Sequence, residues 1–305
     1  GEAPGDAFGA SLAGAGDLDG DGYSDLAIGS CACSGPGKVY VFYGSADGLA
    51  GAPWSQEGET DNDLFGSTLA GAGDVNGDGF TDLAVGAQGY GSGLGKVYLF
   101  YGSAGGLTAA LAAPTWSVEG EVGGVLFGHS LAGAGDLNGD GYADLAAGAY
   151  VSNEAQGKVY VFYGSANGPT GTPDSPDWSA VGEEDQNSFG YALAGAGDVN
   201  GDSFADLLVG DDSYSDALGK AYVFYGSAGG LTQTAAGADW SVTGEDTWSF
   251  FAWAVAGIGD VNDDGYADLA VSDFYYDDDA GKVYVFYGSE AGPTGTAFDP
   301  SWSME

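Results

Sequence analysis

The stretch Asp17-Leu18-Asp19-Gly20-Asp21-Gly22-Tyr23-Ser24-Asp25 recurs four more times along the chain in nearly the same letters. The other copies begin at Asp74, Asp136, Asp198 and Asp260. Each copy has Asp at its first, fifth and ninth positions and Asp or Asn at its third, and an apolar segment follows directly. One short acidic loop is therefore repeated five times, and the repeat organises the whole chain.

The spacing of oxygen-bearing side chains, with glycines between them, is typical of a loop that binds a hard cation such as Ca²⁺, which takes about six to eight oxygen ligands. We expect ligands from the side chains at positions one, three, five and nine and from the backbone carbonyl at position seven. A bidentate ninth residue or a water molecule would complete the set. The predicted cofactor is calcium, about five ions in all, one per repeat. The predicted ligands are Asp17, Asp19, Asp21, Tyr23, Asp25, Asp74, Asn76, Asp78, Phe80, Asp82, Asp136, Asn138, Asp140, Tyr142, Asp144, Asp198, Asn200, Asp202, Phe204, Asp206, Asp260, Asn262, Asp264, Tyr266 and Asp268.

The loop is shorter than an EF-hand loop, which requires a Glu at position twelve. That position is apolar in every copy, where it holds Ile28, Val85, Ala147, Val209 and Val271. The EF-hand interpretation is therefore excluded.

The repeats predict an all-β fold. Each unit contains four short apolar segments, which is typical of a four-stranded antiparallel blade of a β-propeller. We predict one domain over residues 1–305, a five-bladed β-propeller with units at approximately 1–57, 58–119, 120–181, 182–243 and 244–305. In the first unit, the strands are expected at 8–14, 25–29, 38–43 and 53–57.

Turns alternate between the two ends of an antiparallel sheet. The acidic loops, which follow each first strand, should therefore share one rim with the turns after the third strands. The turns after the second strands and the linkers between units should share the opposite rim.

The ends of the chain match the internal spacing between units. From the Trp of one unit to the Phe of the next there are 11 residues, as from Trp54 to Phe65, and joining the chain ends places Trp302 11 residues before Phe8. This arithmetic fits a closed ring, a segment of a longer array, or subunits joined end to end in a fibre.

The chain resembles the FG-GAP repeat family, best known from the heads of integrin α subunits. The resemblance spans all 305 residues and is carried by Phe8-Gly9 with Gly29, by Phe65-Gly66 with Gly86, and by the five acidic loops. It implies a calcium-binding β-propeller that acts in adhesion outside the cell or at its surface. Integrin heads resemble seven-bladed propellers with calcium in only some blades, whereas this chain has five units with a loop in each.

The fourth and fifth units depart from the family pattern at three positions. Ser203 and Asp263 each replace a loop glycine, and Ala252 replaces the glycine after Phe251. We therefore expect the fourth and fifth cation sites to differ somewhat in geometry or affinity.

The rim opposite the acidic loops is where the units differ most, and variation on a fixed scaffold is where ligand selectivity can lie. Its last two turns and one linker combine aromatic rings with carboxylates, which suits a sugar or a cationic peptide group. The alternative is a solvated acidic loop whose rings face the core. The candidate ligand-binding residues are Asp211, Asp212, Tyr214, Asp216, Trp248, Asp273, Tyr275, Tyr276, Asp277 and Asp278.

The chain has 45 acidic residues against five basic ones, a formal net charge of −40. This charge excludes nucleic acid as a partner, because phosphate binding requires a basic surface. No apolar run reaches the roughly 18 residues of a membrane span. The basic residues recur at one position of each unit, where a structural carboxylate partner is expected for Lys38, Lys96, Lys158, Lys220 and Lys282.

Cys31 and Cys33 are close enough in sequence to form a small disulfide, which suits an exported protein, or they remain thiols. The sole histidine, His129, has no recurring catalytic partner, and the recurring Trp residues are expected to pack.

Three functions are compatible with the sequence. The first is a non-enzymatic adhesion or ligand-binding module for an extracellular protein or glycan, acting through the variable rim. The second is a structural subunit of an extracellular filament or surface layer, and the third is a secreted enzyme acting on polysaccharides.

Overall fold

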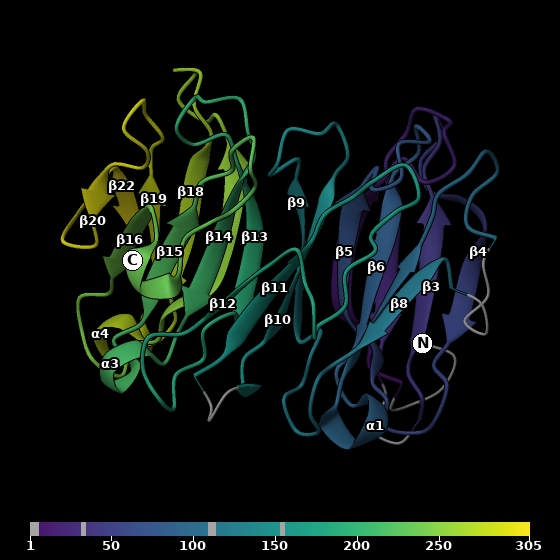
Figure 1. Cartoon of the computed structure of the whole chain (residues 1–305), viewed down its shortest axis with the longest axis horizontal. Helices are drawn as coiled ribbons and strands as arrows, with labels where there is room; N and C mark the ends of the chain where they lie inside the picture. The colour runs from purple at the N-terminus through teal and green to yellow at the C-terminus, as the bar shows by residue number, and fades with distance from the viewer. Residues whose placement is uncertain (1–5, 32–34, 109–113, 153–155) are drawn as a thin grey trace. The chain divides into compact units, whose positions relative to one another are not determined.

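A computed structural model describes residues 6–31, 35–108, 114–152 and 156–305 (Figure 1). Its internal contacts divide the chain into two compact units. The N-terminal unit consists of residues 1–133, 142–147 and 162–176, and the C-terminal unit consists of residues 134–141, 148–161 and 177–305.

Five four-stranded β-sheets form the described part of the chain, so the all-β prediction is confirmed, while closure into a five-bladed propeller stays a prediction. In the N-terminal unit, sheet 1 contains β1 (Phe8–Gly16), β2 (Asp25–Ser30), β3 (Lys38–Tyr43) and β4 (Ala50–Glu57). Sheet 2 contains β5 (Phe65–Gly73), β6 (Asp82–Ala87), β7 (Lys96–Phe100) and β8 (Trp116–Glu119).

The C-terminal unit repeats this arrangement. Sheet 4 contains β13 (Ala192–Gly197), β14 (Asp206–Asp211), β15 (Lys220–Phe224) and β16 (Trp240–Thr243). Sheet 5 contains β17 (Phe251–Gly259), β18 (Asp268–Asp273), β19 (Lys282–Phe286) and β22 (Trp302–Met304). The strands of sheet 3 are divided between the units: β9 (Ser130–Gly135), β10 (Asp144–Ala149), β11 (Lys158–Phe162) and β12 (Trp178–Val181).

Each sheet is a simple meander, because neighbouring strands in the sheet are also neighbours in the sequence. The turns carry short elements: α1 (Tyr90–Gly93), α3 (Tyr214–Ala217), α4 (Tyr276–Asp279), η1 (Ala235–Gly237) and the hairpin β20 (Gly295–Thr296) with β21 (Asp299–Pro300). Within the described ranges, no helix is long and apolar enough to cross a membrane.

The middle strands of each sheet form the core. Every residue of β6 and β7 is buried, and their register places Val85 opposite Tyr98. Strands that are apolar on both faces are expected when neighbouring layers cover both sides. The predicted strands at 25–29 and 38–43 match β2 and β3 closely, whereas β1 continues to Gly16 and β4 already begins at Ala50.

Consecutive sheets within each unit meet through a Phe-Gly segment. Phe65, the first residue of β5, makes a parallel bridge to Gly37, and the side chain of Phe65 is fully buried. Gly37 has φ +83, and a Cβ there would lie 2.2 Å from the carbonyl oxygen of Phe65. Only glycine permits this approach. The same bridge recurs at Gly95–Phe127, Gly157–Phe189 and Gly219–Phe251.

The recurring Trp residues reinforce these junctions. Trp54 packs edge-on against Phe100 of the following sheet, with ring centroids 5.4 Å apart. The contact recurs between Trp116 and Phe162, Trp178 and Phe224, and Trp240 and Phe286. The predicted packing role is thereby confirmed, and such pairs contribute about 0.5–1.5 kcal/mol beyond their buried area.

The lysines hold the linkers between sheets. Lys96 Nζ lies 2.8 Å from Glu59 Oε1, and the hydroxyl of Tyr98 donates to the same oxygen over 2.9 Å. Lys282 and Glu245 repeat this pair at 2.7 Å, with Tyr284 at 3.1 Å. The predicted pairing of the lysines with structural carboxylates is confirmed at these positions.

Candidate functional site

The acidic loops each lie between the first and second strands of a sheet, as the sequence predicted. We call the five segments Asp17–Asp25, Asp74–Asp82, Asp136–Asp144, Asp198–Asp206 and Asp260–Asp268 the cation loops.

The first Asp of each loop organises the backbone. Asp17 Oδ1 accepts hydrogen bonds from the amides of Gly20 and Asp21 at 2.7 and 3.1 Å, and Oδ2 accepts one from Gly22 at 2.8 Å. Asp74 repeats all three bonds within 0.1 Å. The loop therefore curls around its own first carboxylate, which gathers the following oxygen atoms.

The loop geometry fits an oxygen-ligated cation. In the first loop, carboxylate oxygens of Asp17, Asp19 and Asp21 lie within 4.8 Å of one another. Burial, together with the charges of Asp21 and Asp17, raises the pKa of Asp19. A divalent ion would offset this crowding of negative charge.

Four loops have Asn instead of Asp at position three. Asn76 Nδ2 donates to Asp78 Oδ2 over 2.9 Å, and the same bond forms between Asn200 and Asp202 over 3.0 Å. The amide oxygen of Asn76 accepts from the backbone amide of Asp78 at 2.8 Å. The Asn therefore keeps an oxygen in the cluster with one negative charge fewer.

The ninth residue has a second role that the sequence did not reveal. Asp82 is fully buried, and its carboxylate accepts hydrogen bonds from the amides of Val75 at 3.0 Å and Gly102 at 2.9 Å. Burial raises the pKa of Asp82 to about 7. Asp25, Asp206 and Asp268 make the same pair of bonds. This residue thus fastens the cation loop to the turn after the third strand, on the rim that the two turns were predicted to share.

The cation loops also contact the next sheet. The carbonyl of Asp17 accepts a hydrogen bond from the amide of Thr81 at 3.1 Å, and Asp198 does the same with Ala267 at 2.9 Å. The ring of Phe80 lies so close to Gly20 that a Cβ there would be 2.4 Å from it. The aromatic residue at position seven, chosen from the sequence only for its carbonyl, therefore packs on the preceding loop. A change in loop order would be felt at the sheet junction.

On the opposite rim, the candidate residues separate into different settings. Asp211, Asp212 and Asp273 are buried. Asp211 Oδ1 accepts from the amide of Ser188 at 2.9 Å, and burial raises its pKa to about 7. Asp273 pairs with the hydroxyl of Ser249 at 3.1 Å, and burial raises its pKa to about 6. These carboxylates lie beneath the surface and not on it.

Two of the predicted aromatic residues pair with lysines. Lys220 Nζ lies 4.9 Å from the ring centre of Tyr214, and Lys282 Nζ lies 4.3 Å from that of Tyr276. Asp277 is exposed, and the side chain of Asp278 lies outside the described structure. Tyr275 packs edge-on against Phe250 at 5.5 Å and belongs to the face of sheet 5.

Asp216 and Trp248 come together in a hollow of the C-terminal unit, about 380 Å³ in volume, which we call the acidic hollow. The backbone amide of Trp248 donates to the carbonyl of Asp216 over 3.1 Å, so the turn and the linker share this rim as predicted. The sequence did not single out other lining residues: Glu184, Asp185, Asn187 and Phe250. They occupy the linker before the turn and the linker after it, and that shared position in the repeat was the available signal.

Trp248 stands out within the acidic hollow. It has φ +64, and the equivalent positions of three other linkers are Asn62, Gly124 and Gln186, all with positive φ. A bulky residue in this conformation costs about 1–2 kcal/mol. Trp248 is also 67% exposed. Neither backbone preference nor burial accounts for a tryptophan at this position.

The remaining predictions concern single residues. Cys33 lies outside the described residues, so its disulfide with Cys31 stays a prediction. His129 Nδ1 lies 2.8 Å from Gln88 Oε1, and burial lowers its pKa.

The FG-GAP repeat profile matches residues 8–42, 65–100, 127–162 and 189–224. The chain therefore belongs to the FG-GAP repeat family, as its loop and Phe-Gly pattern predicted. The fifth unit, in which Asp263, Ala252 and Ser272 replace glycines of the other units, lies outside the matched segments.

The chain is similar to several known proteins. Integrin alpha-PS2 of Drosophila melanogaster is 35% identical over 212 residues, which cover 64% of this chain and 14% of that protein. Integrin alpha-IIb of Mus musculus is 38% identical over 166 residues, covering 50% and 15%. Phosphatidylinositol-glycan-specific phospholipase D of Rattus norvegicus is 34% identical over 223 residues, covering 66% and 26%. The aligned part of this chain thus spans about a quarter or less of each relative.

Among solved structures, a rhamnogalacturonan lyase, YesW, aligns with a TM-score of 0.40 and 15% identity, covering 83% of this chain and 50% of that chain. At this level of similarity the likeness carries no argument about activity.

Proposed function

We propose that this chain is a calcium-stabilised, extracellular ligand-binding module, and that it binds a cationic side chain of a protein ligand in the acidic hollow. The observation that carries the proposal is Trp248, an exposed aromatic ring held at an unfavourable backbone position beside carboxylates. An aromatic face next to Asp216 and Asp185 matches an Arg or Lys side chain through cation–π and charge-assisted contacts.

Calcium would act structurally in this proposal. The side chains at positions one, three and five would hold the ion, with the ninth residue and the carbonyl of position seven. The ion would supply only positive charge and oxygen coordination. The five loops would then hold the first turns and sheet junctions firmly, while the opposite rim is free to vary.

Binding, and not catalysis, is the proposed activity. Two of the relatives reported above are integrin α subunits, although one is a phospholipase D. The residues that line the acidic hollow, Glu184, Asp185, Gln186, Asn187, Ser213, Asp216, Ala217, Trp248 and Phe250, include no histidine or cysteine. Carboxylates and rings of this kind recognise a cation directly.

The test is calorimetric titration of the calcium-loaded chain with a short capped peptide containing one Arg, against the same peptide with citrulline. We expect the Arg peptide to bind more tightly, and Trp248→Ala and Asp216→Asn each to weaken binding about tenfold. Asp61→Asn, which changes an exposed linker carboxylate in the N-terminal unit, is the matched control and should leave binding unchanged.

Equal binding of the two peptides, or equal losses in all three variants, would show only general attraction to a negative surface and contradict the proposal. A neutral oligosaccharide that binds the same hollow in place of the Arg peptide would also overturn the choice of ligand.

A further inference from the structure

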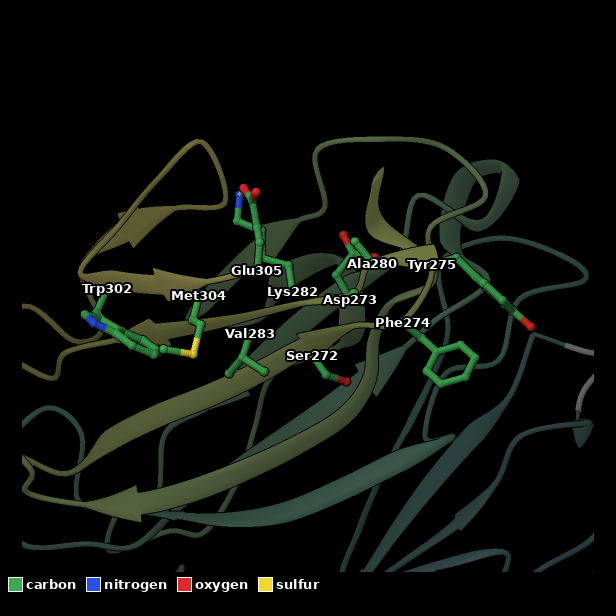
Figure 2. A pocket seen from close by; sticks show the side chains of 11 residues that line it. Ser272, Asp273, Phe274, Tyr275, Ala280, Lys282, Val283, Trp302, Met304 and Glu305 are labelled. Atoms are coloured by element: carbon green, nitrogen blue, oxygen red, sulfur yellow. Dashed lines mark ion pairs between the residues drawn. The ribbon is translucent and has the colours of Figure 1, made fainter. Parts of the chain in front are cut away.

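An apolar groove of about 620 Å³ crosses the face of sheet 5 (Figure 2). Its apolar lining comes from β19, β22 and the turn after β18, and the groove includes Ser272, Phe274, Tyr275, Val283, Trp302 and Met304. Figure 2 shows Val283 between Ser272 and the pair formed by Trp302 and Met304. Val283 is 42% exposed, Trp302 45% and Met304 62%.

The equivalent face is covered in the other four sheets. Val283 corresponds to four residues that are all fully buried: Val39, Val97, Val159 and Ala221. Exposure of this face in sheet 5 is therefore a departure from the repeat and not a property of the strand itself.

The internal junctions show what covers such a face. At Gly37 the backbone of Phe65 approaches, and the next residue, Gly66, lies so near Val39 that a Cβ there would be 2.6 Å from Val39 Cγ2. At Gly281, which corresponds to Gly37, the nearest atom to an added Cβ is Phe274 O at 3.5 Å. The groove is thus the docking place of a Phe-Gly strand that sheet 5 lacks.

The first repeat carries the matching exposed surface. Phe8 is 41% exposed, whereas its four counterparts are fully buried: Phe65, Phe127, Phe189 and Phe251. Leu12 is 63% exposed, whereas Leu69 is 8% and Leu131 is 7% exposed. The strand β1 therefore presents, uncovered, the same side chains that fill this face elsewhere in the chain.

We propose that the apolar groove of sheet 5 binds β1 of a second copy of this chain, so that copies join head to tail. The contact is heterologous, because the groove and the strand are different surfaces of one chain. A pair of copies still exposes one groove and one β1, and further copies can be added.

Two residues weaken this contact relative to the internal junctions. Ser272 stands where the other sheets have glycine, and at Gly29 and Gly86 an added Cβ would lie 2.1 and 2.3 Å from a carbonyl oxygen of the next repeat. Asp263 replaces the glycine on which the next position-seven ring packs, as Phe80 packs on Gly20. The incoming strand must sit farther out, so the association is reversible and concentration-dependent.

The first test is sedimentation equilibrium of the chain over a range of concentrations, in calcium and at high salt to screen the charge of −40. We expect reversible association of the wild type. Val283→Asp on the groove and Leu12→Asp on β1 should each weaken it more than about 100-fold, because a charge would be buried without a partner. Val122→Asp, at a position 63% exposed and outside both surfaces, is the matched control.

Mixing the two variants tests the head-to-tail arrangement. Val283→Asp retains an intact β1, and Leu12→Asp retains an intact groove, so their mixture should form dimers and stop there. Unchanged melting temperatures in calcium would show that each variant is folded.

A third variant should act in the opposite direction. Ser272→Gly restores the close approach of the internal junctions and should tighten association about tenfold or more. A wild type that stays monomeric at all concentrations, a mixture that forms no dimers, or no gain from Ser272→Gly would each overturn the proposal.

Discussion

The cation rim and the turn rim of the C-terminal unit follow opposite rules. On the cation rim, Asp198 and Asp260 hold their loops with the same backbone bonds although one loop contains Ser203 and the other Asp263. On the turn rim, equivalent positions hold residues as different as Gln186 and Trp248. The comparison teaches that hydrogen bonds and close packing fix the first rim, whereas the second rim is free to specialise.

The largest expected effect comes from removing calcium. Without the ion, five clusters of carboxylates repel one another, and each cluster is coupled to the next sheet through its backbone and its aromatic residue. We expect chelation to lower the melting temperature by roughly 10 °C or more. Calorimetry with excess chelator, and then with restored Ca²⁺ or with Mg²⁺ alone, makes the measurement. An unchanged melt would mean that the cation rim is held by its hydrogen bonds alone.

The second prediction concerns the buried ninth residue. Asp82→Ala removes the acceptor for the amides of Val75 and Gly102, and each buried amide left unpaired costs about 1–3 kcal/mol. We expect a loss of about 4 kcal/mol in the free energy of unfolding by urea titration. Asp78→Ala, an exposed position of the same loop, is the control and should affect calcium affinity more than the stability of the metal-free chain.

The third prediction concerns Asp211 on the turn rim. Its pKa is raised from 3.8 to about 7, first by burial and then by Asp212 and Glu183. The native state therefore holds a proton that the unfolded state has lost, and stability falls as the pH rises from about 4 to about 7. Above that range the loss is complete.

Asp211→Ala, which places the residue of Ala87 and Ala149 at this position, should remove that dependence. The gain at neutral pH should be about 2 kcal/mol, because the unpaired amide of Ser188 offsets part of the relief. The gain should vanish near pH 4. Urea titrations at several pH values measure it, with the exposed Asp216→Ala as control. A variant less stable than the wild type at pH 7 would contradict the assignment.

The smallest expected effect lies in the fourth cation loop. Ser203 has φ +75, where the first three loops have glycine, yet its amide still donates to Asp198 over 2.9 Å. Ser203→Gly should stabilise the protein by about 1 kcal/mol by relieving this conformation. Ser92→Gly, at φ +62 in a turn of the opposite rim, allows the same relief to be compared between the rims. A destabilised Ser203→Gly variant would show that the serine has a bonding role in the loop.

Much of the fold was predictable because the repeat states it five times. The strands, the position of the cation loops, the packing of the Trp residues and the pairing of the lysines with carboxylates all follow from periodic patterns. The second role of Asp82 was not predictable, because its partner Gly102 lies 20 residues away and nothing local marks that amide.

The candidate ligand site was predicted only in part. Asp216 and Trp248 do meet in a hollow, but Asp211 and Asp273 are buried beneath the rim. Sequence alternation cannot tell whether the last residue of β14 or β18 points to solvent, because that depends on what the next strand covers.

The sequence by itself determined the class of strands, the five acidic loops and the glycines that allow sheets to approach, since each is a local requirement of backbone conformation or charge. Only the tertiary structure decided which acidic residues are exposed, that the cation loops pack on their neighbours, and that the face of sheet 5 lies open. These features depend on contacts between segments distant in sequence, where the burial of one residue is set by another that local pattern does not reveal.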